Sequence, residues 1–208
     1  AILMSNTKAI AIAGTHGKTT TTSMLTVAMQ SCGEDPSFAI GGTLTTAGSN
    51  AHRGTGNFFI AEADESDGSF VEYLPFGAVI TNIDHDHVDH FATQQSVVDA
   101  FTAFSQRISP EGFLVYCADD AGASSLGSGT THCRTYSYGV DEHADLRIDH
   151  IELKPGGSTA RAFWQGRAIG DLAIQVPGHH NLLNAAAALT AGLIVDLPVA
   201  SFLAGLAT

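Results

Sequence analysis

The chain has 208 residues, 44% of them hydrophobic and 14% charged, and a formal net charge of −12 from 21 acidic and nine basic residues. This length predicts one large domain, or one and a half small ones, with a sizeable core, and so few Lys and Arg argue against a nucleic-acid-binding surface. There is no run of 18 apolar residues and no signal-peptide pattern, and the three cysteines form no CxxC pair, so we expect no membrane insertion, reduced thiols and a cytoplasmic location.

Strand-like and helix-like segments alternate over the first two thirds of the chain. This pattern predicts an α/β fold with a P-loop-type, mostly parallel sheet flanked by helices. Strands are expected at residues 9–13, 37–40, 57–62, 78–81, 112–117 and 135–138, and helices at 18–30 and 93–108.

The last third has a different pattern. Residues 122–131 are almost all small, which predicts a loop. Segments 144–153, 158–165 and 168–176 then alternate with period two, predicting a small antiparallel three-stranded sheet appended to the first. An alanine-rich helix is expected from 178 to about 195, and Pro198 opens another short helix.

A glycine loop follows the first predicted strand. Its sequence, GTHGKT, ends at a predicted helix N-terminus, where backbone N–H groups favour an anion. The lysine supplies charge for outer phosphates and the next threonine a ligand for Mg²⁺. A standard P-loop has glycine where Ile12 stands, so this spacing is tighter; the alternative is a glycine turn with a solvated lysine. The predicted nucleotide-binding residues are Gly14, Thr15, His16, Gly17, Lys18, Thr19 and Thr20.

Two further polar stretches follow predicted strands. Glu62, Asp64, Glu65 and Asp67 come at the end of strand 57–62, where ligands gather in open α/β sheets. Four carboxylates repel one another without a cation, so a Mg²⁺ site with Glu62 as the best ligand is favoured over a solvated acidic loop.

The stretch TNIDHDHVDH at residues 81–90 carries three histidines. A zinc cluster is one interpretation, but the spacing matches neither HExxH nor a zinc finger, and no cysteine is near. We expect one functional histidine beside Mg²⁺-bound phosphate and two solvated or structural ones.

The stretch Pro177-Gly178-His179-His180-Asn181 opens the alanine-rich helix, and Asn184 follows on the same helix face. Asparagine offers the donor and acceptor that an adenine edge requires, whereas its usual role near a helix start is a cap.

Together these stretches resemble the Mur ligase family over nearly the whole chain. The matching residues are GTHGKTTTT (14–22), GG (41–42), AGSNA (47–51), EADESDGSF (62–70), TNIDHDHVDHF (81–91) and PGHHNLLNAAAA (177–188).

The resemblance implies specific roles. Lys18 is expected to contact the β- and γ-phosphates of ATP, Thr19 and Glu62 to hold Mg²⁺, and His87 to serve a second metal site. His180, Asn181 and Asn184 are expected against the adenosine. There are two departures: His179 stands where relatives usually carry a basic residue, and no lysine occurs between Lys18 and Lys154 to provide the modified lysine of sister ligases.

The resemblance further implies an ATP-dependent ligase of peptidoglycan precursor synthesis that joins L-alanine to UDP-N-acetylmuramate through an acyl phosphate. Residues 1–208 are expected to be its central ATP-binding domain, a fragment that binds ATP and ligates poorly without the other domains of the polypeptide. The alternatives are the family's murein-tripeptide-recycling ligase, a non-catalytic nucleotide- or metal-binding module, and a stand-alone P-loop kinase or GTPase. For the last, the guanine-reading NKxD motif and an arginine-rich lid are both missing.

Overall fold

A computed structural model describes residues 7–44, 49–65, 68–84 and 93–208. Its strands are β1 Lys8–Ala13, β2 Ser37–Leu44, β3 Ser49–His52, β4 Phe58–Glu62, β5 Gly77–Ile80, β6 Phe113–Cys117, β7 Arg134–Gly139, β8 Leu146–Lys154, β9 Gly157–Trp164 and β10 Arg167–Ile174. The described strands form one ten-stranded sheet in the order β10-β9-β8-β7-β6-β5-β1-β4-β2-β3. This order places β1 between β5 and β4.

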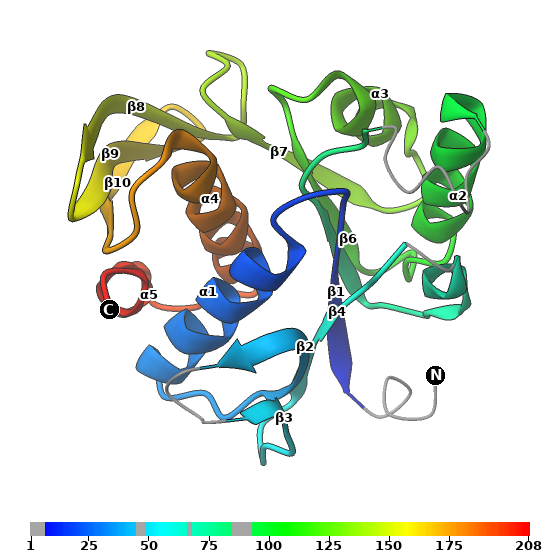
Figure 1. Cartoon of the computed structure of the whole chain (residues 1–208), viewed down its shortest axis with the longest axis horizontal. Helices are drawn as coiled ribbons and strands as arrows, with labels where there is room; N and C mark the ends of the chain where they lie inside the picture. Colours follow the sequence, from blue (N-terminus) through cyan, green and yellow to red (C-terminus); the bar gives the residue numbers. More distant parts are fainter. Residues whose placement is uncertain (1–6, 45–48, 66–67, 85–92) are drawn as a thin grey trace.

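Helices cover both faces of this sheet (Figure 1). They are α1 Lys18–Ser31, α2 Gln94–Ser105, α3 Ala121–Gly129, α4 His179–Ile194 and α5 Val199–Leu206, with a 3₁₀ helix at Ser69–Glu72. Figure 1 shows α1, α4 and α5 on one side of the sheet and α2, α3 and the 3₁₀ helix on the other. Within the described ranges, none of these helices combines the length and apolar character needed to cross a bilayer.

The parallel strands are buried on both faces. In β1, every residue after Lys8 is buried, and β1 pairs in parallel with both β4 and β5. Strands covered by helices on both sides have near-continuous apolar sequences, as residues 9–13 do. The predicted parallel α/β architecture is confirmed, with element ends shifted by a few residues.

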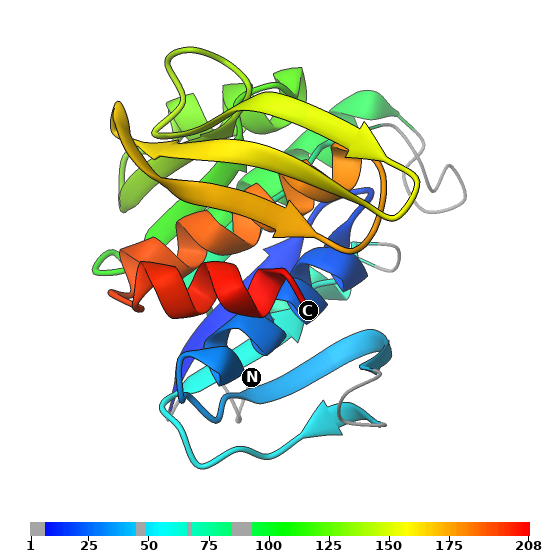
Figure 2. The same cartoon turned by 90° about the vertical axis from the view of Figure 1, so that its left-hand side faces the viewer.

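The three antiparallel strands predicted at the end of the sheet are also confirmed. β8, β9 and β10 pair antiparallel, and the β9–β10 turn has positive φ at Gln165 and Gly166, 47° and 78°. Two such residues in a row suit a two-residue hairpin turn. The meander joins the main sheet at only two register pairs, Tyr138↔Leu146 and Gly139↔Arg147. From there it curls over α4 (Figure 2).

The predicted loop at 122–131 is wrong, because most of that segment forms α3. Asp120 caps this helix by accepting a hydrogen bond from the Ala123 N–H at 2.7 Å. Gly127 packs so closely on the Tyr116 ring that an added Cβ would collide with it. A cap and a close helix–strand contact therefore outweigh the weak helix propensity of glycine and serine.

Candidate functional site

The loop between β1 and α1 lies at the carboxyl end of β1 (Figure 1). Gly14 and Gly17 have positive φ, 137° and 85°, which side-chain-bearing residues rarely adopt. An added Cβ at Gly14 would also collide with Thr81 Oγ1. The two glycines of the motif are therefore required by the backbone path and by its close contact with the end of β5.

Two residues after β5 hold this loop in place. Thr81 Oγ1 donates a hydrogen bond to the His16 carbonyl at 2.6 Å. The Asn82 amide accepts from the His16 N–H at 2.8 Å and donates to the His16 carbonyl at 2.9 Å. The sequence pointed to the histidines of this stretch and missed the scaffold role of its first two residues. The His16 side chain is exposed.

The N-terminus of α1 is suited to an anion. Gly17 is its N-cap residue, no described side chain caps it, and its first turn contains no acidic residue. The first N–H groups of a helix have no intrahelical partner and carry the positive end of the helix dipole. Glycine at the cap leaves them accessible to a phosphate.

Lys18 points back into the loop and pairs with the acidic loop after β4. Its Nζ lies 2.9 Å from the Gly14 carbonyl oxygen and 3.0 and 2.9 Å from the two carboxylate oxygens of Glu65. The Glu65 side chain is only 2% exposed and that of Lys18 11%. Sequence reasoning placed Glu65 among the acidic residues of a metal site, but it did not pair Glu65 with the lysine.

Thr19 and Glu62, the two residues expected to hold Mg²⁺, lie in direct contact. The Thr19 hydroxyl lies 2.9 and 3.0 Å from the two Glu62 carboxylate oxygens, and the Gly41 N–H donates to Glu62 at 2.7 Å. A hydroxyl and a carboxylate are the oxygen ligands that Mg²⁺ prefers, so this donor set fits that ion. Within the described residues, no group of three or more His, Cys, Asp and Glu side chains could hold a metal.

The other predicted loop residues lie around this centre. Thr15 is buried. Its hydroxyl accepts a hydrogen bond from the Asp84 N–H at 2.9 Å and donates one to the Asp84 carbonyl at 3.2 Å. Thr20 lines a hollow of about 420 Å³ along α1, together with Thr19 and Gln175.

The predicted adenosine-side residues lie in the first turns of α4, but they differ in their contacts. Asn184 is 7% exposed and reaches the loop, where an added Cβ on Gly17 would collide with its Oδ1. Asn181 donates to the Pro177 carbonyl at 2.8 Å, and the exposed His180 ring folds over Gly178. The structure thus brings Asn184 to the phosphate loop. His87, with His85 and His90, lies outside the described residues.

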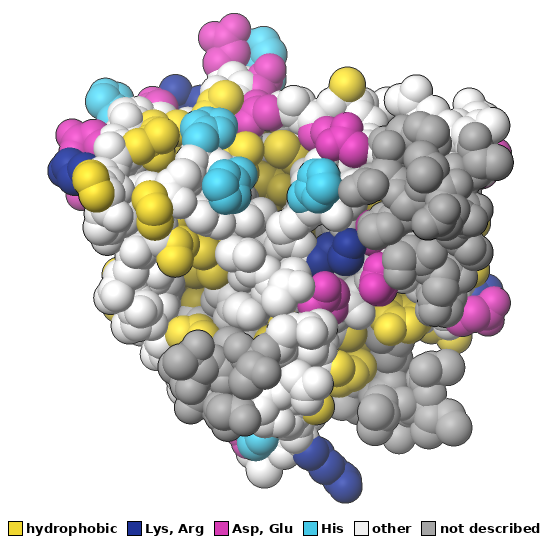
Figure 3. All heavy atoms as spheres, viewed as in Figure 1, with side chains coloured by type: hydrophobic (Ala, Val, Ile, Leu, Met, Phe, Trp, Pro, Cys, Tyr) yellow, Lys and Arg dark blue, Asp and Glu magenta, His cyan; other side chains and the backbone are white. Residues whose placement is uncertain are grey.

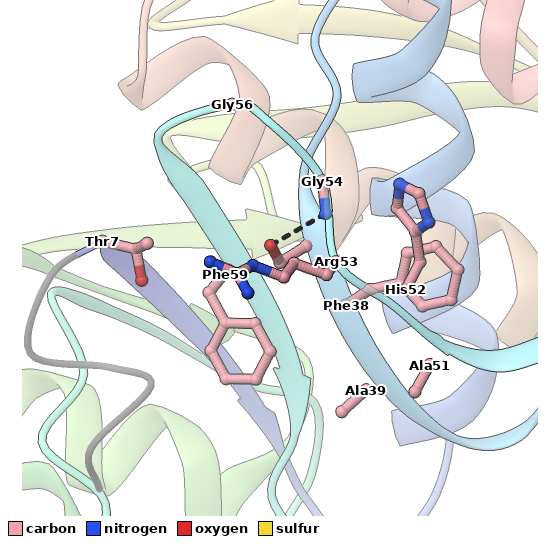
Figure 4. Close-up of a pocket in the computed structure, with 10 residues that line it drawn as sticks. Thr7, Phe38, Ala39, Ala51, His52, Arg53, Gly54, Gly56 and Phe59 are labelled. Carbon is pink, nitrogen blue, oxygen red and sulfur yellow. Dashed lines mark hydrogen bonds between the residues drawn. The ribbon is translucent and has the colours of Figure 1, made fainter.

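A larger cavity of about 680 Å³ lies elsewhere, at the amino ends of β2 and β4 (Figure 4). Figure 4 shows Arg53 and Phe59 lining it, with the Gly54 N–H donating to Ser37 Oγ at 3.1 Å. Phe59 pairs in register with Ala9, near the start of β1. Because ligands of open α/β sheets bind at the carboxyl ends of the strands, we assign the site to the loop and not to this larger cavity.

Positive charge is sparse around the site. Lys and Arg side chains are few and scattered on the face drawn in Figure 3. In the sequence, Lys18 is the only Lys or Arg between Lys8 and Arg53. A polyanionic ligand at this loop would meet Lys18 and the backbone N–H groups at the start of α1.

Comparisons with known proteins identify the family of the chain. Residues 12–192 match the family profile described as the Mur ligase middle domain. The chain is 46% identical over 211 residues to a UDP-N-acetylmuramate–L-alanine ligase of Saccharopolyspora erythraea, covering all of this chain and 43% of that protein. The protein of the same name from Mycobacterium marinum is 46% identical over 212 residues, covering 99% of this chain and 43% of its own length.

Solved structures show the same fold. The UDP-N-acetylmuramate-alanine ligase MurC of Thermotoga maritima superposes with a TM-score of 0.83 at 26% identity, over 96% of this chain and 44% of that one. A UDP-N-acetylmuramate:L-alanyl-gamma-D-glutamyl-meso-diaminopimelate ligase from Neisseria meningitides gives 0.87 at 26% identity, over 98% and 66%. The chain thus spans less than half the length of the curated relatives that it matches.

Proposed function

The chain belongs to the Mur ligase family, and from this premise we propose that it binds Mg-ATP at residues 14–20 and serves a ligase that joins L-alanine to UDP-N-acetylmuramate. One observation carries the proposal: the carboxyl ends of β1, β4 and β5 bring together the uncapped helix N-terminus, Lys18, and the Thr19–Glu62 pair. A helix N-terminus that can bind phosphate, a positive counter-charge and a metal-binding oxygen pair are thereby brought together at one place.

Each residue has a distinct part in the proposed transfer. The N–H groups at the start of α1 hold and orient the phosphates, and Lys18 stabilises charge on the outer phosphate as it leaves for the acceptor carboxylate. Thr19 and Glu62 would hold Mg²⁺ and His87 would serve a second metal site, and metal ions there would neutralise phosphate charge. His180, Asn181 and Asn184 border the adenosine, and Asn184 also lies against Gly17 of the loop.

The overall reaction that we propose forms an acyl phosphate on UDP-N-acetylmuramate. The L-alanine amine then attacks its carbonyl carbon, and phosphate leaves from the tetrahedral intermediate. L-Alanine is favoured over a murein tripeptide by the curated relatives, since two ligases named for L-alanine are each 46% identical to this chain. The two solved structures, one of each kind, are equally similar at 26% identity and do not discriminate between the substrates.

We further propose that residues 1–208 act as the central ATP-binding domain, with the uridine nucleotide and the amino acid bound by other domains of the polypeptide. This proposal rests on the description of the matching profile as a middle domain and on the short span of the relatives that the chain covers.

Calorimetric titration of the chain with Mg-ATP tests the nucleotide site. We expect saturable binding of one ATP that is abolished in Lys18→Ala, and no matching response to Mg-GTP. Titration with Zn²⁺ in place of nucleotide tests the metal-module alternative. Tight Zn²⁺ binding without ATP binding would reject the proposed function.

A further inference from the structure

Lys18 Nζ donates hydrogen bonds to the Gly14 carbonyl and to Glu65 Oε1, and Glu65 Oε2 lies 2.9 Å away in the same ion pair. An ammonium group has three N–H donors and no acceptor. Three oxygens lie within 3.0 Å of Lys18 Nζ: the Gly14 carbonyl and the two Glu65 carboxylate oxygens. A phosphate oxygen that contacts Lys18 Nζ would have to share this ammonium group with the Glu65 carboxylate.

The backbone on either side of Glu65 is anchored by hydrogen bonds. Ala63 N–H donates to the Ile12 carbonyl at 2.8 Å, which ties the acidic loop to β1, and Gly68 N–H donates to the Glu65 carbonyl at 2.9 Å. Because Glu65 is only 2% exposed, water screens its attraction to Lys18 weakly. The pair is thus a built feature of the site and not a surface ion pair.

We propose that Glu65 is a positioning residue that holds Lys18 against the loop and competes with phosphate for its ammonium group. This inference rests on the proposed function and adds a determinant of nucleotide affinity to it. On binding, Lys18 keeps its bond to the Gly14 carbonyl and exchanges a Glu65 oxygen for a phosphate oxygen. The buried negative charge left beside the phosphate opposes binding, so Glu65 weakens nucleotide affinity and favours release.

Glu65→Gln tests this competition directly. The amide oxygen still accepts a hydrogen bond from Lys18, but the negative charge is removed. In calorimetric titrations of the chain we expect the Kd for Mg-ATP and Mg-ADP to fall about fivefold, since a charge-assisted contact is replaced by a neutral one. Adenosine, which carries no phosphate, is expected to bind with unchanged affinity.

Glu72→Gln is the matched control. Glu72 lies in the 3₁₀ helix on the same connection and is exposed, so the same change in charge and shape there is expected to leave all three affinities unaltered. Glu65→Asp keeps the charge but withdraws the carboxylate by one methylene. Glu65→Asp is expected to lower the Kd for Mg-ATP about twofold, to a value between those of the wild type and Glu65→Gln.

The outcomes separate the two proposals. If the unaltered chain fails to bind Mg-ATP, the proposed function is wrong and this inference falls with it. Suppose instead that the unaltered chain binds Mg-ATP. The inference alone is then overturned if folded Glu65→Gln binds Mg-ATP with unchanged or weaker affinity, or if its affinity for adenosine rises as much as its affinity for Mg-ATP. Should Glu65→Gln fail to fold, Glu65→Asp decides by the same criterion.

Discussion

Lys18 serves two partners of the same charge, a phosphate that we propose and the Glu65 carboxylate that the structure shows. Removing one member of a buried ion pair leaves the other without compensation, which costs more than the pair itself contributes. The phosphate-loop lysine of this chain is therefore expected to matter for stability as well as for binding.

We expect Lys18→Ala to lower the free energy of unfolding by about 3 kcal/mol, because the Glu65 carboxylate loses its ammonium partner in a buried position. Urea unfolding followed by circular dichroism measures this loss. The double variant Lys18→Ala/Glu65→Gln is expected to recover most of it. A double variant as unstable as the single one would mean that the loss comes from packing of the lysine stem.

Glu62→Gln is expected to raise the Mg²⁺ concentration needed for half-maximal ATP binding by on the order of tenfold, because one anionic ligand is lost. Magnesium titrations at fixed ATP measure this concentration. Thr19→Val is expected to act in the same direction and Thr19→Ser to remain near wild type, since serine keeps the hydroxyl that contacts Glu62.

His87→Ala is likewise expected to raise the Mg²⁺ requirement, whereas His85→Ala and His90→Ala are expected to leave it nearly unchanged. The same magnesium titration compares the three variants. Equal effects at all three positions would instead indicate a cluster of several histidines on one metal.

At the scale of elements, α3 depends on a single capping carboxylate. Asp120 Oδ1 accepts from the Ala123 N–H at 2.7 Å and from the Ile83 N–H at 3.1 Å, so it also fixes the chain beyond β5. Asp120→Ala is expected to cost about 1–2 kcal/mol of unfolding free energy. Asp120→Asn, which keeps an acceptor, is expected to cost less in the same thermal or urea unfolding experiment, and an equal cost would show that the cap is not the cause.

The Asp35 carboxylate anchors the β2–β3 hairpin through contacts with His52 and Thr55. The Thr55 N–H, followed by the side chains of His52 and Thr55, lowers the pKa of this carboxyl below its ordinary value. A lowered folded-state pKa means that the stabilising contribution is complete above the unfolded-state pKa of about 3.9 and is lost as pH falls through the folded value.

We therefore expect the Tm of the wild type to be higher than that of Asp35→Asn at pH 5–7. This difference in Tm is expected to shrink below about pH 4. Thermal melts of both proteins from pH 7 to pH 3 measure it. A constant difference over this range would show that the carboxylate charge is not what anchors the hairpin.

At the scale of the whole molecule, the proposed site offers groups for phosphate and metal but none that we assign to the acceptor or the amine. Mur-type ligation needs the acceptor carboxylate and the amine held in line with the phosphate, and closing a site between domains supplies much of that positioning. The chain covers 43% of its relative from Saccharopolyspora erythraea.

We expect the isolated chain to bind Mg-ATP with a Kd in the micromolar to millimolar range, on the order of −4 to −8 kcal/mol. Given ATP, UDP-N-acetylmuramate and L-alanine, it is expected to form no UDP-N-acetylmuramoyl-L-alanine by chromatography. Product at the rate of a full-length ligase would overturn our assignment of residues 1–208 as the ATP-binding part of a larger enzyme.

The sequence alone determined the features that are encoded locally. Apolar runs such as residues 9–13 indicated strands covered on both faces, period-two alternation indicated the meander, and the glycines around Lys18 indicated a phosphate loop. Each of these signals lies within a few neighbouring residues, because local backbone conformation and burial restrict which residue types occur there.

The tertiary structure alone decided how these pieces meet. Glu65 stands 47 residues from Lys18, and Asn82 stands 66 residues from His16. They come together because β1 lies between β4 and β5, an order that no local pattern specifies. The helix at Ala121–Gly129 was missed for the same reason, since its small residues become helical only against Tyr116 and under the Asp120 cap. Contacts between distant segments depend on strand order and packing, and these are properties of the whole folded chain.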